Sequence, residues 1–109
     1  MTDDLTGRHV VPLDLDGVTD KAGLMDRCAR ALDLPDWFGR NWDALADSLA
    51  DPSVWPEAAR EKGLLVVVRG WQPYAKTRPR EWETAQEVFA QAVDTLPALC
   101  VALALGGSS

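Results

Sequence analysis

A run of five consecutive aliphatic residues at positions 64–68 is the feature that most limits how this chain can fold. The run reads Leu-Leu-Val-Val-Val, so it lacks the polar and apolar alternation of a strand with one solvated face. Its β-branched residues favour an extended backbone. We therefore predict a fully buried strand of the parallel type at residues 64–68.

Two further apolar segments have the composition of strands. Residues 9–15 form the first, and Pro12 places part of it at a sheet edge or an irregular point, because proline has no amide hydrogen to donate. Residues 99–105 form the last, which we also expect to be buried. Apolar residues at helical spacing fill the regions between, and they predict helices over residues 20–32, 36–50 or 41–50, 56–62 and 81–94.

Alternating strands and helices predict the fold class. The order β-α-α-(α)-β-α-β calls for an α/β domain with a small three-stranded parallel sheet, right-handed crossovers and three to four helices. We expect residues 70–80, which contain Trp71 and two prolines, to be an irregular connection. The 109 residues are 47% hydrophobic, which suits one domain over residues 1–109 with frayed ends at 1–8 and 106–109.

The negative charge of the chain is concentrated in one segment. Residues 33–51 contain five Asp and one Arg, and so carry −4 of the formal net charge of −6. A local acidic patch argues against direct binding of nucleic acid, whose phosphates attract basic surfaces. It favours a basic protein partner that is drawn in by charge.

Within that segment, a helix would separate the acidic from the apolar residues. At about 100° per residue, Phe38, Trp42, Leu45 and Leu49 fall on one side. Trp37 lies between the two stripes. The opposite side carries the charges, with Arg40 the only cation among Asp36, Asp43, Asp47 and, less closely, Asp51.

Helix stability alone does not favour this acidic stripe. Aspartate is a poor interior residue, and the i,i+4 like-charge pair Asp43 and Asp47 disfavours a helix by roughly 0.2–0.5 kcal/mol. Two interpretations remain open. The stripe is either a solvated acidic face near a helix start, or a display of carboxylates for a cation-lined site on a partner.

An enzymatic role finds little support in the sequence. The segment Asp14-Leu-Asp16-Gly-Val-Thr19 after a strand resembles the nucleophile motif of haloacid-dehalogenase-type phosphatases. That chemistry needs further carboxylates for Mg²⁺, and no later strand end supplies them. A turn with a helix-capping Asp is the simpler interpretation. His9 is the sole histidine and no metal-ligand spacing occurs, so we expect neither catalysis nor a cofactor.

The cysteines and the termini indicate the compartment. Cys28 and Cys100 lie in apolar segments, where we expect buried reduced thiols. The first residues include no apolar stretch typical of a signal peptide, and no run approaches the length of a membrane span. We therefore expect a soluble, cytoplasmic protein.

Tryptophan is abundant, and its roles differ by position. Trp42 and Trp82 fall on predicted core faces, where we expect them to pack. Trp55 and Trp71 fall in segments predicted to be irregular, where packing and partner contact both remain open.

The run Leu-Pro-Asp-Trp-Phe-Gly-Arg-Asn-Trp-Asp-Ala-Leu-Ala-Asp-Ser-Leu at residues 34–49 resembles the signature helix of barstar-like proteins, which are intracellular inhibitors of barnase-type ribonucleases. The resemblance implies three parallel strands with packed helices. It also implies that Asp43 and Asp47 contact the cations that normally hold RNA phosphate, with Asp47 in the phosphate subsite. Trp37 would stack at the catalytic centre of the nuclease.

Three departures from the family pattern stand out. Ala46 replaces a frequent tryptophan, and Gln91 aligns with a supporting glutamate. The segment at residues 51–63 is longer than in the best-known member. These changes indicate that the target is a nuclease other than barnase, or another basic toxin.

The resemblance and the charge pattern together predict an inhibitor that binds a basic secreted ribonuclease one to one and is a monomer when free. The alternatives are an immunity protein against another basic toxin and a regulatory or scaffold module without nuclease inhibition. The predicted partner-binding residues are Asp36, Trp37, Arg40, Asn41, Asp43, Ala46, Asp47, Asp51 and Gln91.

Overall fold

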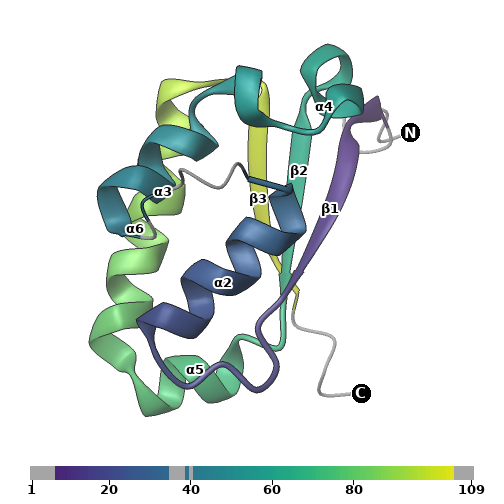
Figure 1. Cartoon of the computed structure of the whole chain (residues 1–109). Helices are drawn as coiled ribbons and strands as arrows, with labels where there is room; N and C mark the ends of the chain where they lie inside the picture. The colour runs from purple at the N-terminus through teal and green to yellow at the C-terminus, as the bar shows by residue number, and fades with distance from the viewer. Residues whose placement is uncertain (1–6, 35–38, 40, 105–109) are drawn as a thin grey trace.

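Three parallel strands form the sheet of the computed structural model, which describes residues 7–34, 39 and 41–104. The strands are β1 (His9–Asp14), β2 (Leu64–Arg69) and β3 (Leu99–Leu103), in the spatial order β1-β2-β3 (Figure 1). The register places Val66 of β2 beside Val11 on one side and Val101 on the other. The predicted three-stranded parallel sheet and its α/β class are confirmed.

The helices lie mainly to one side of this sheet (Figure 1). The structure has five α-helices in its described part, where the sequence predicted three to four. None of them is long and apolar enough to cross a membrane, within the described residues. In chain order the elements are α2 (Lys21–Leu32), α3 (Trp42–Leu49), the 3₁₀ turn η1 (Pro52–Val54), α4 (Glu57–Lys62), α5 (Gln72–Thr77) and α6 (Pro79–Thr95).

Burial along the strands shows which face the helices cover. Val11, Leu13 and Val66 are at most 5% exposed, and they share one face of the sheet. On the opposite face Val10 is 49% exposed and Ala102 is exposed. The prediction of a buried last strand was therefore wrong, because β3 is an edge strand whose second face has no helix over it.

The extra helix is α5, in the segment predicted to be irregular. Pro73 is compatible with it because it stands in the first turn, where no intrahelical N–H bond is lost. Trp71 stacks on Trp82 with ring centroids 5.2 Å apart, and its indole Nε1 donates to the carbonyl of Ala104 at 3.0 Å. Trp55 is 2% exposed. Both tryptophans left open by the sequence therefore pack within the fold.

The predicted helix boundaries hold where the sequence supplies a cap. Asp20 is the N-cap of α2, and its Oδ1 accepts from the amide of Gly23 at 2.9 Å. The second helix begins at Trp42, which agrees with the later of its two predicted starts. The short helix α4 follows Pro56 and ends at Gly63, as predicted.

The backbone conformation of Gly63 makes this glycine important for stability. Its φ of 88° and ψ of 167° fall in a region that is nearly exclusive to glycine, and an added Cβ would lie 2.8 Å from the carbonyl oxygen of Ala98. Gly63→Ala should lower the free energy of unfolding by about 1–3 kcal/mol or more, as measured by denaturant titration. Gly23→Ala in α2 should change it by less than about 1 kcal/mol. Equal effects at the two sites would contradict this account.

The two thiols should differ in reactivity. Cys28 is 1% exposed, and burial raises the pKa of its thiol to about 12, so that its reactive thiolate is scarce at ordinary pH. Cys100 is half-buried on β3. Mass spectrometry after alkylation at pH 8 should show rapid labelling of Cys100 alone, and labelling of both thiols after unfolding. Fast labelling of Cys28 in the folded chain would contradict the packing described.

Candidate functional site

The start of α3 is fixed by the side chain of Asn41. The backbone of Asn41 is extended, with φ −135° and ψ 173°, and its Oδ1 accepts from the amide of Ala44 at 2.7 Å. This is an N-cap, which satisfies one of the free amides at the helix start. The cap places Asp43 in the first helical turn, where the helix dipole favours a carboxylate.

The apolar side of α3 determines which way its acids face. Leu45 and Leu49 are at most 1% exposed, and α3 packs against α6. Trp42 is half-buried against the core, with the ammonium of Lys21 at 5.8 Å from its ring centroid. Because one side of α3 is buried in this way, Asp43 and Asp47 lie on its exposed side.

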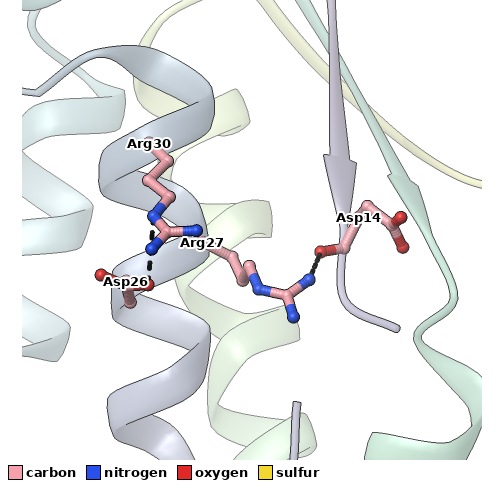
Figure 2. Close-up of polar contacts among 4 residues, drawn as sticks. All are labelled: Asp14, Asp26, Arg27 and Arg30. Atoms are coloured by element: carbon pink, nitrogen blue, oxygen red, sulfur yellow. Dashed lines mark hydrogen bonds and ion pairs between the residues drawn. The ribbon is translucent and has the colours of Figure 1, made fainter. Parts of the chain in front are cut away.

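The side chains of Asp43 and Asp47 are both exposed. Among residues 7–34, 39 and 41–104, neither carboxylate takes part in a hydrogen bond or an ion pair. Helix α2 shows the usual alternative at the same i,i+4 spacing, where Arg30 Nε lies 3.4 Å from Asp26 Oδ2 (Figure 2). On α3 the corresponding cation is missing, which leaves two carboxylates one turn apart to face solvent.

A hollow of about 570 Å³ lies beside Asp47. This hollow was not predicted from the sequence, although the small side chains around Asp47 are a signal that could have revealed it. Small residues on α3 and the following turn leave room that larger side chains would fill. The described residues that line the hollow are Gly39, Ala44, Asp47, Ser48, Ala50, Asp51 and Val54.

Asp51 lies outside α3, which ends at Leu49. It is the N-cap of η1, and its Oδ1 accepts from the amide of Ser53 at 3.0 Å and from the Ser53 hydroxyl at 2.7 Å. These two hydrogen bonds lower the pKa of the Asp51 carboxyl. Asp51 is therefore ionised at neutral pH and brings a second fixed negative charge to the hollow.

The remaining predicted residues divide into two groups. Ala46 is half-buried against the core, and Gln91 is exposed on α6, the helix that packs on α3. Asp36, Trp37 and Arg40 lie outside the described residues. The structure thus places Asp43 and Asp47 on one exposed face and places Asp51 with Asp47 around one hollow.

The phosphatase-like segment and possible metal-binding groups are the other candidates for chemistry. The carboxylate of Asp14 accepts from the amide of Asp16 at 3.0 Å, which makes the phosphatase-like segment a turn after β1. The described part of the chain holds no group of three or more His, Cys, Asp or Glu residues placed to bind a metal ion. The two exposed carboxylates on α3 can accept hydrogen bonds from cationic groups.

A search of curated proteins gives no significant match to this sequence. The sequence model of one family, described as barstar (barnase inhibitor), does match, over residues 8–104. That match covers all three strands and all five α-helices described above, including the capped acidic helix α3. The chain therefore belongs to the barstar family.

Proposed function

We propose that this protein inhibits a barnase-type ribonuclease by placing the exposed face of α3 in the active-site cleft of the enzyme. One observation carries the proposal: Asp43 and Asp47 are exposed, one turn apart, and without partners in the described part of the chain. Carboxylates in this state keep all of their acceptor capacity for charge-assisted hydrogen bonds to Arg and Lys. Membership of the barstar family supports this choice of partner.

The mechanism is mimicry of the substrate's charge. A ribonuclease cleft holds cations where RNA phosphates bind, and two rigid carboxylates can occupy those positions without offering a bond to cleave. No cofactor or turnover is involved, and one chain would occupy one enzyme. The fixed helix lowers the ordering cost of binding, because the carboxylates do not have to be brought together first.

Ala46 and the hollow beside Asp47 support a partner other than barnase. The family often has a tryptophan at the position of Ala46, and the smaller residue removes that contact surface. The hollow, with Asp47 and Asp51 among its lining residues, can accept a side chain from the partner. We therefore propose a related nuclease with a protruding basic residue, and an immunity role against another basic toxin is the second candidate.

Charge-removing substitutions test the inhibitor proposal. Asp47→Asn should weaken binding to a susceptible ribonuclease by about 2–5 kcal/mol, or roughly 30-fold to 5,000-fold in Kd, because the cation opposite is left unpaired. Glu61→Gln removes the same charge from a different helix, α4, and should change Kd little. Calorimetric titration with several barnase-type enzymes, at two salt concentrations, measures both.

If the two substitutions weaken binding equally, the affinity depends on the net charge of the chain and not on the position of the carboxylates on α3. Wild-type binding to none of the enzymes would contradict ribonuclease inhibition and favour a regulatory or scaffold role. An affinity that does not change with salt concentration would contradict the electrostatic mechanism, since exposed charges are screened by added salt.

A stability comparison separates a binding role from a structural one. Asp47→Ala removes the like-charge neighbour of Asp43 and a poor helix former, so the free energy of unfolding should stay constant or rise by about 0.5 kcal/mol. Asn41→Ala removes the N-cap and should lower it by about 1 kcal/mol. Chemical denaturation of both variants gives the values. A clear loss of stability in Asp47→Ala would mean that this carboxylate holds the fold together.

A further inference from the structure

The two edge strands of the sheet, β1 and β3, differ in their protection against pairing with a further strand. On β1 the residues whose peptide groups point away from β2 include Pro12, which has no N–H, and Asp14, whose carbonyl accepts from Arg27 Nη1 at 2.8 Å (Figure 2). Proline and charged side chains on an edge strand are devices that prevent further strand pairing. The β1 edge is therefore interrupted at two places.

The β3 edge carries no such protection. Its sequence, Leu-Cys-Val-Ala-Leu, has no charge and no proline. The bonds from Leu64 N to Ala98 O and from Ala104 N to Val68 O show that even-numbered residues of this segment face β2. Because peptide groups alternate along a strand, the N–H and C=O of Val101 and Leu103 point outward. None of these four groups has a hydrogen-bond partner among the described residues.

An apolar groove runs beside this open edge. It has a volume of about 320 Å³ and lies between α6 and β3. Val101 and Leu103 are both half-buried and line it from the strand, while Phe89, Ala90 and Val93 line it from the helix. Free backbone groups next to an apolar groove fit an added extended strand better than a helix or a small polar molecule.

We infer that the β3 edge pairs with β3 of a second copy of this chain, in an antiparallel arrangement about a two-fold axis at Ala102. In this register Val101 lies opposite Leu103 of the second copy, and the reverse pair follows by symmetry. All four outward groups of each copy are then satisfied by the other copy, so the edge is self-complementary. The result is a continuous six-stranded sheet, in place of the monomer expected from the sequence.

The side chains fit this register. Ala102 is exposed, and at the axis it would face its own copy in a non-hydrogen-bonded pair, where Cα atoms approach to about 4.5 Å. A small residue suits that distance.

Both α6 helices would lie on the same face of the joined sheet, so the two apolar grooves would meet across the junction. With one short strand from each copy, the interface is at the small end of the range for specific complexes, which predicts a weak, reversible dimer.

Salt distinguishes this association from the ribonuclease proposal, on which it does not depend. Each copy carries a net charge of −6, so two copies repel one another through solvent. Screening this repulsion should strengthen the dimer, whereas binding of a basic nuclease should weaken with salt. The carboxylates of α3 lie on a different element from the β3 edge.

Analytical ultracentrifugation of the full chain from low micromolar to near-millimolar concentration tests the inference. The wild-type weight-average mass should rise toward twice the monomer mass, and more steeply at high salt. Ala102→Lys would place two ammonium groups face to face at the axis, and should weaken dimerisation at least tenfold. Val10→Lys puts the same charge on the same sheet face but on β1, and should associate like the wild type.

Amide hydrogen exchange gives an independent measure. In the wild type, the amides of Val101 and Leu103 should gain protection with concentration, while those of Cys100 and Ala102 are protected at all concentrations by β2. Val101→Pro removes one outward N–H, as Pro12 does on β1, and should also abolish association. A monomeric wild type at every concentration, or equal association of Ala102→Lys and Val10→Lys, would overturn the inference.

Discussion

Coverage of one face of a parallel sheet by helices is the constraint on which the rest of this structure depends. The alternating side chains of β2 send Leu64, Val66 and Val68 into the core, and most of the connecting helices lie on that side of the sheet (Figure 1). α2 and α6 pack on the strands themselves, whereas α3 lies against α6. This outer position is what leaves one long side of α3 facing solvent, and the acidic residues occupy that side.

The same constraint explains where reactivity and association can arise. The helices bury the thiol of Cys28 and the ring of Trp82, so neither side chain is available to a partner. Within the described residues, the two proposed interaction surfaces are the outer side of α3 and the β3 edge of the sheet. These regions lie on different elements and use different chemistry, carboxylates on α3 and backbone groups on β3. Each can therefore be removed by substitution without changing the other.

Much of this could be predicted from the sequence, because the signals were local. Asp20 and Asn41 cap their helices, and the aliphatic run at residues 64–68 forms the central strand. What the sequence could not supply depends on three-dimensional placement. Helix α5 lies within residues 70–80, which were predicted to be an irregular connection, although a proline in the first turn, such as Pro73, is compatible with a helix. The exposed face of β3 and the hollow beside Asp47 depend on which elements lie next to them.

The central claim is that the exposed side of α3 is the surface that meets the ribonuclease. Nuclear magnetic resonance of the ¹⁵N-labelled chain, titrated with an unlabelled barnase-type enzyme, tests it most directly by cross-saturation of amides at the interface. The account predicts that the affected amides cluster at residues 41–51 and the turn that follows them. An effect concentrated on β3, α4 or the exposed sheet face, with α3 untouched, would contradict it.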